Sequence, residues 1–255
     1  MYSKLDLLNL YNDADFYDAE FMDRNIEFEF YKDLCDGAEN VLEVACGTGR
    51  ITIPLAKSGI DIAGTDISEG MIVSARKNAS AAGVDIKFSV EDALFTNGRF
   101  DLVFIATNAF QHLLSFEDAL AFLYACRNSL SPNGRIVIDL QVPNVGKLSR
   151  KYSETRPYKT FNYLGNKVVA NLRGNYENLT QLYMFDIEYT QGQEVIKKKK
   201  VAMRMYYPQE LSLLFKAAGL SIIQEYGEYD KSKLTNYSYK QIYVLKIQEH
   251  IHQNN

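Results

Sequence analysis

The clearest pattern in the chain lies between Asn40 and Ser68, NVLEVACGTGRITIPLAKSGIDIAGTDIS. A short apolar segment runs through two glycines, Gly47 and Gly49, into residues of helical periodicity and then into a second apolar segment that ends at Asp66. Apolar segments too short for a helix, separated by an amphipathic stretch, predict a strand–helix–strand unit. Many proteins bind a nucleotide with such a unit, so the pattern raises the question of which nucleotide this chain binds.

The same alternation continues as far as Pro143. Strands followed by helices at this spacing favour right-handed crossovers and a parallel sheet with helices on both faces. We therefore predict an α/β fold, a doubly wound, Rossmann-like sheet of seven strands with an antiparallel insertion after the fifth. The first five strands are expected at Val41–Val44, Ile60–Gly64, Ile86–Ser89, Phe100–Ala106 and Arg135–Leu140, and the helices at Gly49–Lys57, Ser68–Ala82 and Phe116–Leu130.

After Pro143 the pattern changes to alternating polar and apolar residues with turn pairs, which is typical of antiparallel hairpins. The segment YPQELSLLFKAAGL then predicts a helix with Pro208 in its first turn and Gly219 at its end. The expected strands of this half are Lys167–Asn175, Leu179–Thr190 and Val195–Tyr206, and then Ser221–Tyr229 and Gln241–Ile247 at the far edge of the main sheet.

We expect a single domain over residues 1–255. Residues 1–39 are expected to form one or two short helices that cap the site, residues 40–145 and 207–248 the core, and residues 146–206 an antiparallel insertion on the substrate side. The lysine run KKKK at 197–200 falls within a strand, where alternate lysines point to opposite faces, so it indicates edge protection rather than nucleic-acid binding.

The composition favours a small-molecule partner. The chain is 47% hydrophobic, and its net charge of -4 and pI near 5.5 provide no basic field for nucleic acid or anionic membrane. The sequence shows neither a secretory signal nor an apolar run of roughly 18 residues, which predicts a cytoplasmic protein. Three cysteines without CxxC spacing and three scattered histidines predict neither disulfides nor a metal site. We expect a monomer or homodimer.

The residues around the glycines favour one class of nucleotide. Gly47 and Gly49 allow the backbone to turn sharply after the first strand and approach a ligand, and Asp66 is placed to accept both hydroxyls of a ribose. A dinucleotide site would have a third glycine where Thr52 stands. Glu43 adds negative charge where phosphates would lie. S-adenosylmethionine, a phosphate-free cation with a ribose, fits these residues.

These motifs resemble those of the class I S-adenosylmethionine-dependent methyltransferases. VLEVACGTGRITIPLAKSGIDIAGTDISEGMIVSA is similar to their first two motifs, and FDLVFIATNAFQHLLSFEDALAFLYACRNSLSPNGRIVIDL to their fourth and fifth strand region. The resemblance is close over residues 11–140 and weaker in YYPQELSLLFKAAGL and YGEYD. It implies an enzyme with S-adenosylmethionine as cofactor, in the small-molecule branch similar to the amino-sugar N-methyltransferases.

The resemblance also implies roles for the motif residues. Glu43 would orient the region under the methionine part, and Gly47 and Gly49 would pass beneath the ligand. Asp66 would take the ribose hydroxyls, and Ile67 would pack on the adenine face.

Asp92 and the backbone of Ala93 would read the amino edge of the adenine, and Thr107 would line the methionine side. Asp92 has the alternative of capping a helix, and Met71 that of core packing with an edge on the adenine. The predicted cofactor-binding residues are Tyr11, Glu43, Ala45, Gly47, Gly49, Arg50, Asp66, Ile67, Met71, Glu91, Asp92, Ala93 and Thr107.

Two residues are predicted to be catalytic, His112 and Tyr17, and no metal is predicted. His112 follows the fourth strand and titrates near neutrality, which suits a base or a group that positions the acceptor; the alternative is a cap or a bond to a backbone carbonyl. Tyr11 and Tyr17 lie in LYNDADFYDAEF, where the family's N-terminal helix folds over the cofactor. A phenol there would orient the methyl or the acceptor, or would simply pack.

The function that these observations favour is methyl transfer to a small-molecule acceptor, with an amine as the first choice. The same decorated fold also serves O-methylation and C-methylation. The sequence also leaves open an RNA or protein methyltransferase and a non-catalytic S-adenosylmethionine-binding module.

Overall fold

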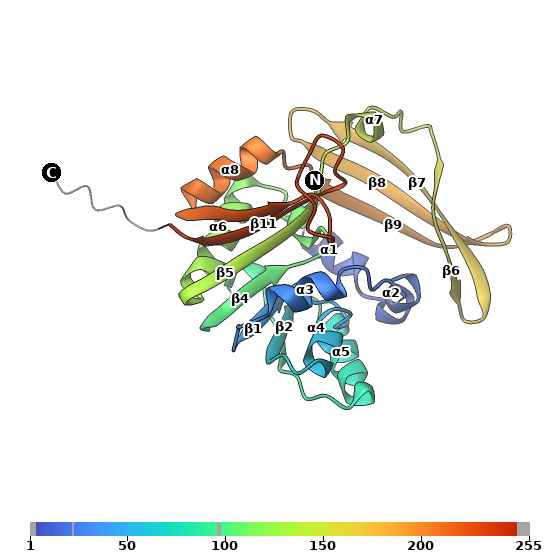
Figure 1. Ribbon diagram of the computed structural model, residues 1–255. Coiled ribbons are helices and arrows are strands. Elements are labelled where there is room, and N and C mark those ends of the chain that lie inside the picture. Colours follow the sequence, from blue (N-terminus) through green and yellow to red (C-terminus); the bar gives the residue numbers. More distant parts are fainter. Residues whose placement is uncertain (1–3, 22, 96–97, 249–255) are drawn as a thin grey trace.

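A seven-stranded sheet forms the core of the protein (Figure 1). The structure is a computed structural model that describes residues 4–21, 23–95 and 98–248. The strand order is β10-β11-β5-β4-β1-β2-β3; the pairs from β5 to β3 are parallel, and β11 is antiparallel to both β5 and β10. This confirms the predicted α/β, doubly wound fold. The strands are β1 Val41–Val44, β2 Ile62–Asp66, β3 Phe88–Val90, β4 Phe100–Ile105, β5 Leu130–Gln141, β10 Leu220–Tyr226 and β11 Lys240–Ile247.

Helices cover both faces of this sheet. On one face Phe30, Tyr31 and Leu55 pack against Phe104, and on the other Phe122 and Phe215 belong to the larger buried cluster. The first layer contains α3 (Phe28–Leu34), α4 (Thr52–Lys57) and α5 (Glu69–Ala82), and the second contains α6 (Phe116–Asn128) and α8 (Pro208–Ala217).

Ligand-binding positions follow from the order of the strands. The chain passes from β1 outward to β2 and β3 and then returns to β4 on the other side of β1, so the topology reverses between β1 and β4. In such sheets ligands bind outside the carboxyl ends of the strands at this point. The turns after β1, β2 and β4 therefore border the expected site.

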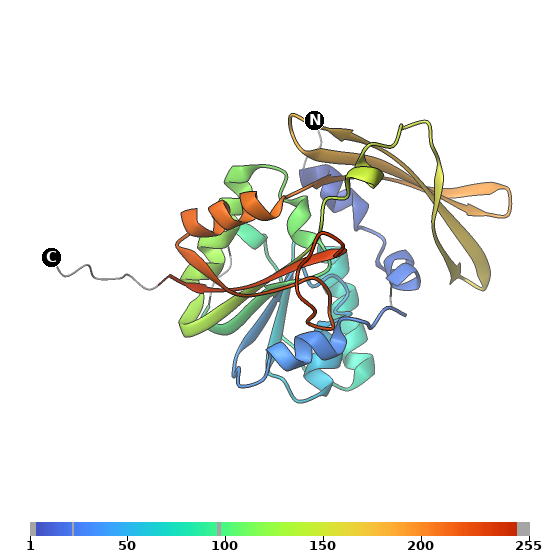
Figure 2. The same ribbon diagram turned by 45° about the horizontal axis from the view of Figure 1, so that its top comes forward.

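A second, four-stranded sheet lies beside the core, with all its strand pairs antiparallel and the order β6-β7-β8-β9. Figures 1 and 2 both show the first two helices, α1 (Lys4–Leu10) and α2 (Ala14–Phe21), between the two sheets. Leu10 and Phe16 pack there against Val168, Tyr189 and Val201. The strands are β6 Arg156–Tyr163, β7 Asn166–Glu177, β8 Leu182–Gln191 and β9 Glu194–Arg204.

Several expected elements differ from those observed. The second sheet has four strands rather than the three expected, because β6 (RPYKTFNY), which lies largely within the segment of alternating residues, also pairs with β7. The N-terminal segment holds three helices rather than one or two, α3 being the third.

Strand and helix boundaries also moved. Helix α4 begins at Thr52 and not at Gly49, because the backbone at Gly47 and Gly49 has positive φ angles of 57° and 84°. Strand β2 begins at Ile62, because the Ile60 N–H bonds back to the end of α4. Other boundaries also differ from those expected: β3 ends at Val90, β5 extends from Leu130 to Gln141, β8 begins at Leu182, β9 ends at Arg204 and β10 ends at Tyr226.

The four lysines at 197–200 alternate between the faces of the edge strand β9, as predicted. Lys198 is exposed and pairs with Glu188. Edge protection is the wrong explanation for Lys197 and Lys199, however, because they face α2 and form ion pairs with Asp13 and Glu20. Lys199 is only 8% exposed.

Two other observations concern the sequence-based expectations. Cys35, Cys46 and Cys126 are all buried free thiols. Among the helices in the described ranges, none is long and apolar enough to cross a membrane.

Candidate active site

A cavity of about 1150 Å³ begins at the carboxyl ends of β1, β2 and β4 and extends to the inner face of the second sheet. It exceeds the roughly 300–1,000 Å³ that is typical of a site for one small molecule. All of the predicted site residues line it except Glu43 and Gly49. The cavity therefore has room for two ligands side by side.

The two signature glycines have different surroundings. A Cβ on Gly47 would point at the ring of Tyr17 from 3.8 Å, on the cavity side. A Cβ on Gly49 would instead lie 2.8 Å from Ile53 Cδ1 and 3.2 Å from the ring of Phe88. Gly47 therefore keeps the cavity open, whereas Gly49 allows α4 to pack against the sheet.

Asp66 has the geometry of a ribose-binding carboxylate. Its Oδ2 accepts the Gly47 N–H and its Oδ1 accepts the Ser68 N–H, both at 2.9 Å. A carboxylate oxygen accepts two hydrogen bonds, so each oxygen keeps capacity for one hydroxyl. Burial raises the pKa of Asp66, and backbone hydrogen bonds from Ser68, Gly47 and Ile67 oppose that rise.

Glu43 lies beneath the glycine turn and not in the cavity wall. It is 3% exposed and accepts a hydrogen bond from the Thr52 hydroxyl. Burial raises the pKa of Glu43 to about 8, so the carboxyl is largely neutral near pH 7 and its charge does not select against phosphates in the way the sequence suggested. Thr52, which stands where a dinucleotide site would have glycine, provides the donor for this carboxyl.

Arg50, which follows Gly49 at the end of the glycine turn, also lines the cavity. Its Nη1 lies 2.5 Å from Glu27 Oε1 and donates to the Arg24 carbonyl at 2.8 Å. Arg50 also bonds the Tyr17 hydroxyl, while burial raises the pKa of Tyr17 to about 12. Tyr17 therefore keeps its proton and holds its ring over Gly47.

The residues predicted for the adenine side line the cavity after β2 and β3. The Oδ1 of Asp92 accepts the Leu94 N–H at 3.2 Å at the start of the short helix η1 (Ala93–Phe95), so Asp92 caps a helix and also lines the cavity. Met71 is 1% exposed and belongs largely to the core. The residues of this wall are Ile67, Met71, Glu91, Asp92 and Ala93.

His112 is fixed by hydrogen bonds at both ring nitrogens. Nδ1 lies 3.2 Å from the Ala202 carbonyl, which only accepts, so Nδ1 carries the proton and donates. Nε2 therefore accepts from the Tyr11 hydroxyl at 2.9 Å. Burial lowers the pKa of His112 to about 4. The ring is neutral near pH 7 and connects the turn after α1, the segment after β4 and strand β9.

The residues directly after β4 have unusual backbone angles. Thr107 and Asn108 have φ angles of 51° and 70°, and both line the cavity. Side chains other than glycine rarely adopt this region, and where they do the strain often marks a functional site. Asp139 on β5 holds the turn, accepting the Thr107 N–H at 2.9 Å.

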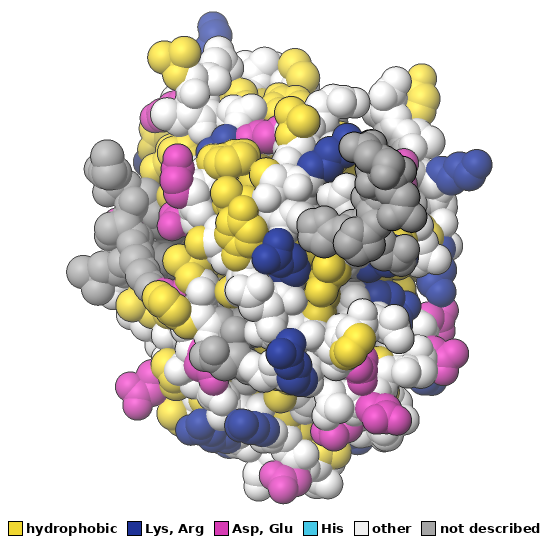
Figure 3. All heavy atoms as spheres, turned by 90° about the vertical axis from the view of Figure 1, so that its left-hand side faces the viewer, with side chains coloured by type: hydrophobic (Ala, Val, Ile, Leu, Met, Phe, Trp, Pro, Cys, Tyr) yellow, Lys and Arg dark blue, Asp and Glu magenta, His cyan; other side chains and the backbone are white. Residues whose placement is uncertain are grey.

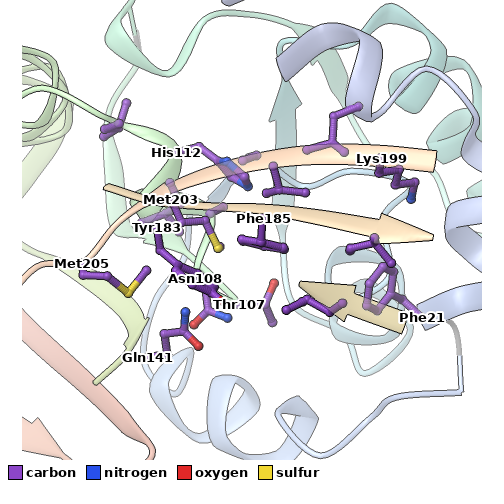
Figure 4. Close-up of a pocket in the computed structure, with 18 of the residues that line it drawn as sticks. Phe21, Thr107, Asn108, His112, Gln141, Tyr183, Phe185, Lys199, Met203 and Met205 are labelled. Atoms are coloured by element: carbon purple, nitrogen blue, oxygen red, sulfur yellow. The ribbon is translucent and has the colours of Figure 1, made fainter. Parts of the chain in front are cut away.

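The far wall of the cavity comes from the second sheet. Figure 4 shows Phe185 of β8, with Lys199 and Met203 of β9, around the same hollow as Thr107 and Asn108. This wall is largely apolar and aromatic.

One charged group is buried in that wall. Glu20 of α2, 1% exposed, accepts from the Tyr189 hydroxyl at 3.1 Å and from Lys199 Nζ at 3.3 Å. Sequence reasoning missed Glu20, Lys199 and Asn108 as site residues, because partners separated by up to 179 residues leave no local signal.

The described part of the chain contains no cluster of three or more His, Cys, Asp or Glu side chains arranged to hold a metal ion.

A comparison with known families shows what kind of protein this is. The family model described as a methyltransferase domain matches residues 41–134. The glycine/sarcosine N-methyltransferase of Parasynechococcus marenigrum is 30% identical over 202 residues, which cover 76% of this chain and 67% of that protein. The chain belongs to the S-adenosylmethionine-dependent methyltransferase family, whose cofactor is S-adenosylmethionine.

Two other curated relatives match only the central part. A demethylmenaquinone methyltransferase of Thermus thermophilus is 35% identical over 105 residues, 39% of this chain and 46% of that protein. A ubiquinone biosynthesis O-methyltransferase of Cereibacter sphaeroides is 31% identical over 125 residues, 46% of this chain and 49% of that protein. The chain thus spans about half the length of these relatives.

Solved structures share the whole fold. The CcbJ methyltransferase from Streptomyces caelestis has a TM-score of 0.81 at 22% identity, covering 94% of this chain and 98% of that one. The sugar N-methyltransferase KedS8 from a Streptoalloteichus species has a TM-score of 0.69 at 18% identity, covering 88% and 87%.

Proposed function

We propose that this protein transfers the methyl group of S-adenosylmethionine to a small-molecule acceptor, and that the acceptor atom is an amine nitrogen. The observation that carries the proposal is the continuous cavity, which joins the wall around Asp66 to the wall formed by the second sheet. The residues of the first wall would hold the cofactor, and the remaining space beside the second sheet would accommodate the methyl acceptor.

The residues of the first wall fit this cofactor. The two oxygens of Asp66 each have capacity for one ribose hydroxyl, Gly47 leaves the space that a Cβ would narrow, and Arg50 lies at the end of the cavity beside Tyr17. When bound, S-adenosylmethionine supplies an electrophilic methyl group on a positively charged sulfur.

The chain contributes orientation and exclusion of water. Tyr11, directly after α1, and Tyr17, on α2, line the cavity with ring centroids 6.0 Å apart. Holding two reactants in line is worth about 7–11 kcal/mol of barrier in well-oriented systems.

We assign His112 the role of a positioning residue. Both of its nitrogens are bonded and its pKa is lowered to about 4, so it accepts the Tyr11 hydroxyl and fixes that ring rather than removing a proton from the acceptor. A free amine needs no base before attack, because its lone pair forms the new bond and the proton leaves afterwards to solvent.

The choice of an amine is supported by the names of similar proteins. They include an N-methyltransferase of glycine and sarcosine and a sugar N-methyltransferase, but also an O-methyltransferase. O-methylation of a small metabolite is therefore the second candidate.

A small-molecule acceptor is also supported by the surface charge. Figure 3 shows one face of the protein on which basic and acidic side chains are interspersed rather than gathered in a basic stripe, and the net charge is -4. Nucleic-acid binding relies on such a stripe. The proposal includes a cytoplasmic protein that acts as a monomer or homodimer without nucleic acid or membrane.

The test is methyl transfer from S-adenosylmethionine carrying a labelled methyl group to a panel of small amines and their matched alcohols. We expect label in amine products. Label confined to alcohols would support the O-methylation candidate. Tight cofactor binding by calorimetry without transfer to any panel member would refute the proposal and indicate a binding module.

A further inference from the structure

The turn after β4 carries a side-chain amide whose orientation the structure determines. Asn108 lines the cavity at the point where the sheet topology reverses. Its Oδ1 lies 3.1 Å from Lys240 Nζ. A lysine ammonium has three donors and no acceptor, so the oxygen of the amide must face Lys240. The NH₂ group, on the other branch of the amide, is turned away from Lys240.

Lys240 is itself held in place. It is 8% exposed, and Nζ lies 2.6 Å from Oδ1 of Asp139, whose side chain is fully buried. The other oxygen, Oδ2, accepts the Thr107 N–H at 2.9 Å and the Tyr229 hydroxyl at 2.5 Å. One carboxylate therefore fixes both the backbone of the strained turn and the cation that orients the Asn108 amide.

A second amide lies nearby. Gln141 is the register partner of Lys240 across the β5–β11 pair, and it shares a face of β5 with Asp139 because alternate residues of a strand point the same way. Gln141 also lines the cavity, and Figure 4 draws it beside Thr107 and Asn108. The wall next to the expected path of the methyl group is thus polar, whereas the wall of the second sheet is largely apolar.

We propose that the Asn108 amide is the hydrogen-bond donor for an oxygen of the methyl acceptor, and that Lys240 and Asp139 are positioning residues that turn its NH₂ group toward that oxygen. The acceptor class is then an amine with a hydroxyl, ether or carboxylate oxygen on a neighbouring carbon, because a hydrogen bond spans only about 2.9 Å. This inference rests on the proposed methyl transfer to an amine.

The test compares pairs of amines that differ in the oxygen: 2-aminocyclohexanol with cyclohexylamine, and 2-aminoethanol with propylamine. For the wild-type protein we expect kcat/KM to be at least about tenfold higher for the oxygen-bearing member, because a site built to bond an oxygen discriminates strongly against an analogue without one.

Asn108→Asp is the matched variant. Aspartate has the same shape, tolerates a positive φ and still accepts from Lys240, but it lacks the NH₂ donor. We expect it to remove the preference for the oxygen-bearing amine while binding of S-adenosylhomocysteine, measured by calorimetry, is unchanged. Lys240→Met should weaken the preference by freeing the amide to turn, and Lys240→Arg, which keeps a donor, should restore most of it.

The outcomes are distinguishable. Equal kcat/KM for both members of each pair in the wild type, or a preference that survives in Asn108→Asp, would overturn this assignment and leave methyl transfer intact. Transfer to no amine at all, with S-adenosylhomocysteine still bound, would overturn the proposed function and this assignment with it.

Discussion

The two halves of the cavity are built in opposite ways. The half proposed to bind the cofactor comes from residues close in sequence, at the turns after β1 and β2, and uses backbone geometry as much as side chains: Gly47 has a positive φ angle and Asp66 bonds two backbone N–H groups. The acceptor half comes from side chains on distant elements, such as Glu20 on α2 and Lys199 on β9. We therefore expect substitutions in the two halves to change different quantities.

The largest effect is expected at Asp66. Replacing it with alanine should raise the dissociation constant for S-adenosylhomocysteine by at least about 100-fold, because two charge-assisted hydrogen bonds of about 1.5–3 kcal/mol each are lost. Calorimetry on the folded variant measures this. Asp85→Ala, in an exposed loop outside the cavity, is the control. Equal affinities for the two variants would contradict the assignment of the cofactor half.

The next effect is on stability and concerns the acceptor half. Lys199→Met leaves the Glu20 carboxylate buried without its cation, which costs about 3–5 kcal/mol of unfolding free energy. The neighbouring Lys198→Met is the matched control, since Lys198 is exposed and its surface pair is worth about 1 kcal/mol or less. Urea unfolding measures the stability of the two variants. Similar midpoints for both would show that the Glu20–Lys199 pair contributes little to the free energy of unfolding.

The signature glycines provide a finer comparison within the cofactor half. Gly49→Ala should lower the free energy of unfolding by about 2 kcal/mol, because its Cβ meets Ile53 and Phe88 in addition to the cost of a positive φ. Gly47→Ala should cost only about 1 kcal/mol but should weaken cofactor binding, since its methyl group enters the cavity. If Gly47→Ala instead lost more stability and Gly49→Ala weakened cofactor binding, the roles that we give to the two glycines would be exchanged.

A further effect is expected in the pH dependence of stability, to which His112 contributes. Its pKa is lowered to about 4, whereas the unfolded chain has the ordinary value of about 6.5. Between these values the unfolded state binds a proton that the folded state does not, so stability should fall as the pH falls, by about 1.4 kcal/mol per unit at most. His112→Gln should lack that slope.

The same variant tests whether His112 acts as a base. The ratio of the wild-type methyl-transfer rate to that of His112→Gln should stay constant from about pH 5 to about pH 8, because the wild-type ring does not titrate there. A ratio that falls as the pH is lowered, with a midpoint near pH 6.5, would show that His112 removes a proton during the reaction.

The features that could be predicted from the sequence are those that depend on residues close together in the chain. The apolar segments and glycines from Val41 to Asp66 predicted the strands, the turn and the ribose carboxylate, because each signal is contained within a few residues. Strand β6 was not among the expected strands, although most of it lies in the alternating region, and its pairing with β7 becomes visible only in the structure. The charge of Glu43 was overestimated because its burial, which raises its pKa, becomes visible only in three dimensions.

The acceptor half was beyond sequence reasoning for the same physical reason. KKKK indicated a solvated edge, and only the packing of α2 against the second sheet shows that Lys199 points inward to Glu20. The hydrogen bond from Lys240 to Asn108 likewise joins residues 132 positions apart.

The central claim is that one cavity holds the cofactor in one half and the methyl acceptor in the other, and Phe185→Trp tests it most directly. Phe185 lines the acceptor half from β8, so a larger ring there occupies the acceptor's space and leaves the wall around Asp66 untouched. We predict unchanged calorimetric binding of S-adenosylhomocysteine and a loss of methyl transfer to the best amine of the panel. Loss of cofactor binding, or transfer at the wild-type rate, would contradict the account.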